Sequence, residues 1–278
     1  MSIVVKELYH TYNLGLPTEV TALSGVSMST ERGEIVSVVG LMGSGKSTLA
    51  QHLNGLLFAQ IGSVSVDNCE ITAKSVFTNE VRRKVGYVFQ YPEQQIFSET
   101  VEKEISFAPT NWGVTGTQLT KRIKESLSTV GLDENVLTKN PFTLSSGIKR
   151  RVAIASVIAA TPDFIVLDEP NAGLDARGTE ELINLMKTQA DQGVGIVHIT
   201  HDLTLALSIS DKILVLDEGK SISWGTPKKT AELLCLEHLI KLPLPDILNL
   251  SNILKKRGKV NQVTLNPYEL ASMISERE

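Results

Sequence analysis

A glycine-rich segment, 40–48, has the residue types and spacing of a phosphate-binding loop. Glycines let the backbone curl so that its N–H groups converge on phosphate oxygens, and a following helix adds positive partial charge at its N-terminus. Lys46 is predicted to reach the β and γ phosphates of a nucleotide, and Ser47 to hold Mg²⁺ through its hydroxyl. The residues predicted to contact the nucleotide here are Gly40, Leu41, Met42, Gly43, Ser44, Gly45, Lys46, Ser47 and Thr48.

Two adjacent carboxylates, Asp168 and Glu169, follow a short apolar run. The run 164–167 is typical of a buried strand, and catalytic groups of α/β proteins lie at the carboxyl ends of such strands. Asp168 is predicted to position Mg²⁺, directly or through water. Glu169 is predicted to accept a proton from an attacking water.

A histidine, His201, follows a third apolar run, Gly195–Thr200. A lone polar residue at a strand end is more often structural than catalytic. Because His201 occupies the same kind of position as Asp168, we expect it to contact the γ-phosphate and the attacking water.

The elements that must position these groups are short strands and an inserted helical region. The run Ile35–Val39 is rich in β-branched residues and leads into the glycine loop, and helix-forming residues follow it. The chain between Lys46 and Asp168 is several times longer than one βαβ unit of about 30 residues. We therefore expect an inserted helical subdomain, with helices over 118–130 and 145–160.

Composition excludes several classes of protein. The 278 residues are 42% hydrophobic and 21% charged, which is a globular balance. A net charge of −4 disfavours a dedicated nucleic-acid binder, and the two cysteines, Cys69 and Cys235, support neither a disulfide framework nor a zinc site. We also expect no secretory signal and no membrane-spanning helix.

With these motifs in order, the sequence resembles the ATP-binding subunits of ABC transporters. The segments that carry the resemblance are 40–47 (Walker A), 86–90 (the strand before the Q-loop), 144–151 (signature), 164–169 (Walker B), 172–175 (D-loop) and His201 (switch histidine). The resemblance implies that Gln90 ligates Mg²⁺ and that Tyr12 stacks on the adenine of ATP. It implies an α/β fold: a P-loop NTPase (RecA-like) core, an N-terminal antiparallel β part, an inserted helical subdomain and a short C-terminal α extension.

The segments 90–97 and 100–113 and the tail after residue 225 are similar to the energy-coupling factor ATPases. That resemblance implies a nucleotide-binding domain over 1–225, with its helical subdomain at about 91–160, and a dimerisation extension over 226–278. It also implies a dimer of ATPases, peripheral on the cytoplasmic face of the cell membrane. Its partners would be a transmembrane coupling protein and a small membrane substrate-binding protein, which together take up a vitamin or metal ion.

The signature departs from the Leu-Ser-Gly-Gly-Gln pattern of the family at Ser146 and Ile148. By the resemblance, Ser145, Ser146 and Gly147 would contact the nucleotide held by the other subunit. A Cβ at residue 146 would hold the backbone away from a phosphate, and loss of the glutamine removes a polar contact. We therefore favour an asymmetric heterodimer with a paralogous ATPase, in which the site completed by this signature is the weaker one. A homodimer, or a pair in which Ser146 is tolerated, stays open.

The tail is predicted to form two short amphipathic helices. Asp246 is the expected N-cap of the first, with Ile247, Leu250 and Leu254 on its packed face, and Asn266-Pro267 begins the second. The basic run 149–151 is expected to be a solvated helix face. After Gln90, we expect about half of Phe97, Ile105, Phe107, Pro109 and Trp112 to form the subdomain core and the others to line an apolar groove for partner helices.

Two other classes remain as alternatives. A soluble ABC-type ATPase that acts on ribosomes or nucleic acid shares the signature, but usually carries a coiled-coil insertion or two nucleotide domains. A P-loop kinase of small molecules would lack the 144–151 signature and the switch histidine. We expect ATP and Mg²⁺ as ligands and no nucleic acid as a partner.

Overall fold

A computed structural model describes residues 1–72, 78–236 and 242–275. Its strands are β1 (Ser2–Tyr12), β2 (Val20–Glu31), β3 (Ile35–Val39), β4 (Ile61–Val66), β5 (Cys69–Glu70), β6 (Val85–Val88), β7 (Phe164–Asp168), β8 (Gly195–Thr200), β9 (Lys212–Asp217) and β10 (Lys220–Gly225). Its α-helices are α1 (Lys46–Leu53), α2 (Thr78–Lys84), α3 (Val101–Asn111), α4 (Gly116–Thr129), α5 (Ser146–Ala159), α6 (Ala176–Asp191), α7 (Leu203–Ile209), α8 (Pro227–Leu236), α9 (Asp246–Lys256) and α10 (Pro267–Ser275).

A six-stranded sheet, in the order β10-β9-β3-β8-β7-β6, positions the predicted catalytic groups. The pairs β9–β3, β3–β8, β8–β7 and β7–β6 are parallel, and β10 is antiparallel to β9. All residues of β3, β7 and β8 are buried, because the sheet is covered on both faces. The parallel strands therefore bring the ends of β3, β7 and β8 to one edge of the sheet, as predicted.

A second sheet, antiparallel and in the order β2-β1-β4-β5, forms the N-terminal β part. Helix α1 lies between the two sheets. Its Leu49, Ala50 and Leu53 share one core with Ile3 of β1 and Val38 of β3. This shared core fixes α1 and the loop before it against both sheets.

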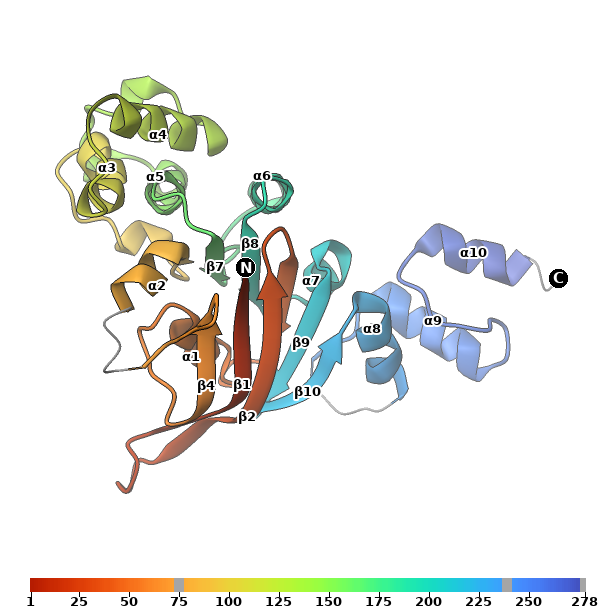
Figure 1. The fold of residues 1–278 in the computed structure, drawn as a ribbon. Helices are drawn as coiled ribbons and strands as arrows, with labels where there is room; N and C mark the ends of the chain where they lie inside the picture. The colour runs from red at the N-terminus through yellow and green to blue at the C-terminus, as the bar shows by residue number, and fades with distance from the viewer. Residues whose placement is uncertain (73–77, 237–241, 276–278) are drawn as a thin grey trace.

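Three helices, α3, α4 and α5, stand together on one side of the molecule, inserted between β6 and β7 (Figure 1). Their buried residues share a second core with the opposite face of the large sheet; Ile105 of α3, Leu127 of α4 and Ile165 of β7 belong to it. The predicted helix 145–160 is found at 146–159, and the predicted helix 118–130 begins two residues earlier, at Gly116. The α/β class and the inserted helical subdomain are as predicted.

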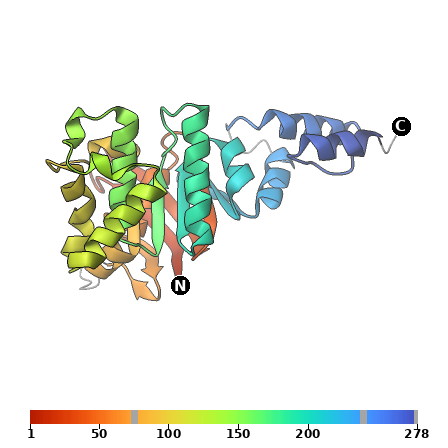
Figure 2. The same ribbon diagram turned by 90° about the horizontal axis from the view of Figure 1, so that it is seen from above.

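The C-terminal helices α9 and α10 lie at the end of the molecule opposite to α3–α5, as Figure 2 shows. They are attached through a third core, in which Leu248 of α9 and Val263 meet Leu207 of α7 and Leu234 of α8. Asn266 accepts hydrogen bonds from Tyr268 N and Glu269 N, at 2.9 and 3.4 Å, as the predicted start of the last helix requires.

Two predictions about α9 need correction: its N-cap, and the place of Leu250 on its packed face, on which Ile247 and Leu254 are half-buried. Pro245, not Asp246, occupies the N-cap position, and no side chain caps the helix. The buried residues of α9 are Leu248, Ser251 and Asn252, whereas Leu250 is 49% exposed. Across the three described ranges, no helix is long and apolar enough to cross a membrane.

Candidate functional site

The glycine loop joins β3 to α1 in the predicted strand–loop–helix order. Gly45 is the N-cap residue of α1 and has φ 99°, a backbone conformation that residues other than glycine rarely adopt. A Cβ there would also collide with the carbonyl oxygen of Ala22. The loop therefore needs glycine both for its turn and for its close approach to β2.

Lys46 is buried inside the loop. Its Nζ donates hydrogen bonds to the carbonyl oxygens of Gly40 and Leu41, at 2.9 Å each, and lies 3.9 Å from Glu169 Oε1. Burial lowers the pKa of Lys46, and the nearby carboxylates of Glu169 and Asp168 oppose that shift. The cation is thus held at the strand ends, where it can meet phosphate oxygens.

Asp168 ends β7 and accepts a hydrogen bond on each of its carboxylate oxygens. Ser47 Oγ donates to Oδ1 at 3.2 Å, and the hydroxyl of Tyr87 donates to Oδ2 at 2.9 Å. Burial, and next the charge of Asp168, raise the pKa of the Tyr87 phenol, so the hydroxyl keeps its proton. The Ser47 hydroxyl and the Asp168 carboxylate are oxygen ligands of the kind that Mg²⁺ prefers, so the donor set fits this ion.

Glu169 lies between a lysine and a histidine. Its Oε2 accepts a hydrogen bond from Nδ1 of His201 at 2.8 Å, opposite the side that faces Lys46. Its backbone has φ 47°, and its N–H donates to the carbonyl oxygen of Ile199 at 3.0 Å. A non-glycine residue in this conformation costs about 1–3 kcal/mol and is typical of functional sites. Of the three predicted catalytic groups, Glu169 therefore contacts both of the others, Lys46 and His201.

Tyr12 and Gln90, two further predicted contacts of the nucleotide or Mg²⁺, lie outside the cluster of Lys46, Glu169 and His201. The Tyr12 hydroxyl lies 3.1 Å from Thr48 Oγ1, so the aromatic residue at the end of β1 is tied to the first turn of α1. Its ring meets that of His10 edge-on and is 37% exposed. Gln90 is exposed just beyond β6, and no hydrogen bond joins it to Ser47 or Asp168 among the described side chains.

The signature residues lie at the start of α5. Ser145 is the N-cap, and its Oγ accepts a hydrogen bond from Ile148 N at 3.4 Å. Ser146 and Gly147 are exposed, and a Cβ at Gly147 would meet no other atom within 4 Å. Ile148, in contrast, packs against the core of the helical subdomain. The structure therefore brings neither Ser145 nor Ser146 nor Gly147 to the Lys46 site of the same chain.

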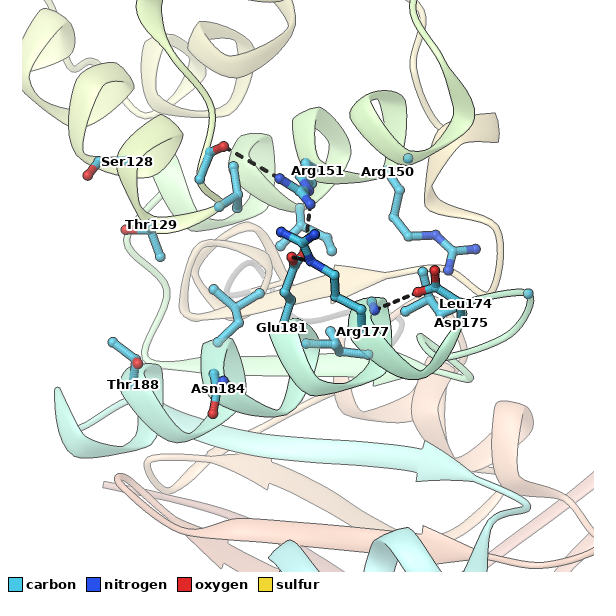
Figure 3. Close-up of a pocket in the computed structure, with 18 residues that line it drawn as sticks. Ser128, Thr129, Arg150, Arg151, Leu174, Asp175, Arg177, Glu181, Asn184 and Thr188 are labelled. Carbon is cyan, nitrogen blue, oxygen red and sulfur yellow. Dashed lines mark hydrogen bonds and ion pairs between the residues drawn. The ribbon is translucent and has the colours of Figure 1, made fainter.

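A cleft of about 1060 Å³ opens beside the signature, between α5 and α6 (Figure 3). Arg151 crosses this cleft from α5, donating to Glu181 Oε2 at 2.6 Å and to the carbonyl oxygen of Gly131 at 3.5 Å. Arg177 also donates to Glu181, at 3.1 Å. The D-loop residues Gly173 and Asp175 line one end of the cleft, so the signature and the D-loop share one surface.

Sequence reasoning missed Tyr87 and Arg150. A tyrosine in a buried strand was the available signal for the first, because a buried hydroxyl needs a partner. Arg150 is only 11% exposed in its side chain and donates to the carbonyl oxygens of Ala172 at 2.8 Å and Pro170 at 3.3 Å. It fixes the loop after Glu169 to the signature helix, so the prediction that 149–151 is a solvated face is wrong for Arg150.

The apolar residues after Gln90 divide as expected between core and surface. Ile105 and Pro109 are buried, and Trp112 is half-buried. Phe97 and Phe107 are 59% and 49% exposed, and their rings meet edge-on with centroids 4.8 Å apart. This exposed aromatic pair lies on the helical subdomain.

A family model and individual sequence relatives indicate the same family for this chain. The sequence model of the family described as ABC transporter matches residues 23–172. The energy-coupling factor transporter ATP-binding protein EcfA2 of Clostridium tetani is 40% identical over 260 residues, which cover 93% of this chain and 90% of the relative.

Solved structures agree with these sequence relatives. The structure of cbiO1 from Clostridium perfringens, described as part of the ABC transporter complex cbiONQ, has a TM-score of 0.74 and 35% identity, and the match covers 89% of this chain and 97% of that one. A dimeric bacterial ABC transporter cassette has a TM-score of 0.72 and 30% identity, with 81% of this chain and 98% of that one covered.

Proposed function

The chain belongs to the family of ABC transporter ATP-binding proteins, and we propose that it is the ATP-hydrolysing subunit of an energy-coupling factor transporter. The observation that carries this function is the position of Glu169, directly after β7, whose carboxylate is held between Lys46 of the glycine loop and His201. The bond from Arg150 to the following loop adds to this placement. A nucleotide γ-phosphate bound by the loop would lie beside these three groups.

Each residue then has a role in hydrolysis of ATP. The loop N–H groups and Lys46 bind the phosphates, Tyr12 stacks on adenine, and Glu169 accepts the proton of the attacking water. His201 holds the Glu169 carboxylate and reaches the γ-phosphate. Mg²⁺, which Ser47, Asp168 and Gln90 would hold, neutralises charge on the phosphates.

The partners that we propose are a paralogous ATPase, a transmembrane coupling protein and a small membrane substrate-binding protein. Support for a two-subunit site comes from the exposure of Ser146 and Gly147, which leaves the start of α5 open to a nucleotide held by another chain. A peripheral position on the cytoplasmic face of the cell membrane follows from such an assembly. The exposed pair Phe97–Phe107 offers an apolar contact for helices of the coupling protein.

We propose a heterodimer rather than a homodimer because of the altered signature. Ser146 adds a Cβ where a phosphate would approach, and Ile148 turns an apolar side chain into the subdomain core. The nucleotide bound by this chain would be hydrolysed against an unaltered signature of the partner. In the 226–278 extension, Leu250 and Ile253 are 49% and 40% exposed on α9, which supports a role of this extension in dimerisation.

The test is affinity purification of the tagged chain from detergent-solubilised native membranes, followed by measurement of ATP hydrolysis by the purified complex. We expect a second ATPase and a polytopic membrane protein, together with hydrolysis that is lost when the tagged chain carries Lys46→Ala. Co-purification of the chain with the membrane protein but without a second ATPase would indicate a homodimer. Recovery of ribosomes or nucleic acid without a membrane protein would contradict the transporter function and favour the alternative class.

A further inference from the structure

The two carboxylate oxygens of Asp168 are held by residues from different elements. Ser47, in the first turn of α1, donates to Oδ1, and Tyr87, on β6, donates to Oδ2. We propose that Tyr87 is a positioning residue, which fixes the orientation of the Asp168 carboxylate toward Mg²⁺-bound ATP. This inference rests on the proposed function, because it concerns the same site.

Burial makes this hydrogen bond significant. Asp168 is 6% exposed and Tyr87 is 8% exposed, so water does not replace a lost partner easily. Removal of a hydrogen-bond donor from a buried carboxylate costs about 1–3 kcal/mol of free energy or more, because the charge is left without compensation. The register of the sheet places the two groups together: Tyr87 pairs with Val166, and its long side chain reaches the carboxylate two residues further along β7.

Tyr87 and Ser47 are not equivalent donors. The Ser47 hydroxyl is itself predicted to hold Mg²⁺, and its hydrogen bond places Oδ1 beside a predicted ligand. Tyr87 is not a predicted ligand, and its bond to Oδ2 leaves Oδ1 directed toward the glycine loop. The phenol therefore determines which oxygen of Asp168 is presented.

The ring of Tyr87 has its own support. It packs against the ring of Phe89, with centroids 4.6 Å apart and an interplanar angle of 53°. Phe89 is 44% exposed and directly precedes Gln90. A contact made at this surface thus reaches Asp168 through two aromatic rings and one hydrogen bond.

The experiment measures binding of a non-hydrolysable ATP analogue to the full-length chain, first in EDTA and then during titration with Mg²⁺. Tyr87→Phe removes only the hydroxyl, and we expect it to raise the Mg²⁺ concentration at the midpoint about tenfold without changing affinity in EDTA. Tyr91→Phe is the matched control. It removes a hydroxyl that is exposed and has no hydrogen bond among the described residues, so its midpoint should equal that of the wild type.

Phe89→Ala is a second variant, which removes the ring support but keeps the hydroxyl. It should raise the midpoint about threefold. An unchanged midpoint in Tyr87→Phe would overturn the inference, and so would an equal loss of affinity with and without Mg²⁺, because that indicates a general structural role. If Tyr87→Phe does not fold, an unchanged midpoint in Phe89→Ala would overturn it. A wild-type chain with no Mg²⁺-dependent binding would instead contradict the proposed function.

Discussion

The glycine-loop site and the signature are the two regions of this chain that are predicted to face phosphate, and they are built in opposite ways. In the first, Lys46, Asp168 and Glu169 are buried, and each contacts another member of the site. In the second, Ser146 and Gly147 are exposed, and the Ser145 side chain beside them accepts a capping hydrogen bond from Ile148 N. The first region is therefore preorganised by its own fold, whereas in the proposed dimer the second region would depend on the nucleotide that another chain brings.

The difference follows from the cost of burying charge. A buried ammonium or carboxylate group is stable only when it is paired and hydrogen-bonded, so the fold must position Lys46 and its acidic neighbours together. An exposed serine hydroxyl or glycine N–H stays hydrated and needs no partner inside the chain. Substitutions in the glycine-loop site should therefore abolish ATP hydrolysis, whereas substitutions in the signature should change its rate.

The largest expected effect is that of Glu169→Gln. This change keeps the size of the side chain but removes the proton acceptor, so ATP hydrolysis by the assembled complex should fall about 10²–10⁴-fold. The measurement is phosphate release at saturating ATP, together with substrate uptake in vesicles. Glu99→Gln is the control, because the Glu99 side chain is 83% exposed and forms an ion pair with Lys103, four residues further along the chain.

The same change in the partner ATPase tests the asymmetry. If this signature forms the weaker site, substitution of the partner's equivalent glutamate should reduce transport less than Glu169→Gln does. Equal losses from the two substitutions would contradict the asymmetric dimer, and would mean that Ser146 is tolerated.

The next effect concerns His198 and His201, which lie three residues apart but differ in burial, as the glycine-loop site and the signature do. His201 lies at the strand end with its side chain 65% exposed, whereas His198 is fully buried within β8, with Nδ1 3.1 Å from Ser37 Oγ. Burial lowers the pKa of His198 from 6.5 to about 4, against a smaller opposing effect of Asp202. The unfolded chain thus binds a proton between about pH 6.5 and 4 that the folded chain does not.

Stability should therefore fall as the pH is lowered through this window, by up to about 3 kcal/mol from His198. His198→Gln keeps a neutral polar side chain, and urea unfolding at pH 7.5, 6.0 and 5.0 should show a smaller loss of free energy of unfolding than in the wild type. Burial also lowers the pKa values of His10 and His52, so the variant should keep part of the pH dependence. Identical slopes for variant and wild type would show that His198 does not contribute.

The sequence predicted the first region better than the second for a physical reason. The strands at Ile35–Val39 and Gly195–Thr200 have the predicted bounds, because β-branched runs buried on both faces leave a strong local pattern. Lys46 and Asp168 could be assigned because each follows such a strand. Tyr87 could not be assigned, because its hydrogen bond to Asp168 depends on the pairing of β6 with β7, two strands that lie far apart in the sequence.

The buried face of α9 shows a second limit. The hydrophobic spacing indicated Ile247, Leu250 and Leu254. Ile247 and Leu254 are only half-buried and Leu250 is exposed, whereas the helix buries Ser251 and Asn252 together with Leu248. Ser251 Oγ accepts from Thr264 N at 2.9 Å, and Asn252 Nδ2 donates to the carbonyl oxygen of Cys235 at 3.2 Å. Polar residues that find partners in distant segments are buried without any signal in a hydrophobicity pattern. The same limit explains why the basic run at Arg150 was misinterpreted.

The smallest and most informative effect is expected from Ser146→Gly in the signature. In a complex whose own catalytic glutamate is replaced by Glu169→Gln, the remaining hydrolysis comes from the site that this signature completes. Removal of the Cβ lets the backbone approach a phosphate, so this residual rate should rise several-fold, up to about tenfold. Ile148 is not substituted in this experiment. It packs against the subdomain core, so its replacement would change the stability of the protein as well as the rate of hydrolysis. Ser272→Gly on α10 is a control for the loss of an exposed serine in a helix. A residual rate that Ser146→Gly does not raise would show that the Cβ is accommodated, and the weakness of the second site would then have to come from the partner's own residues.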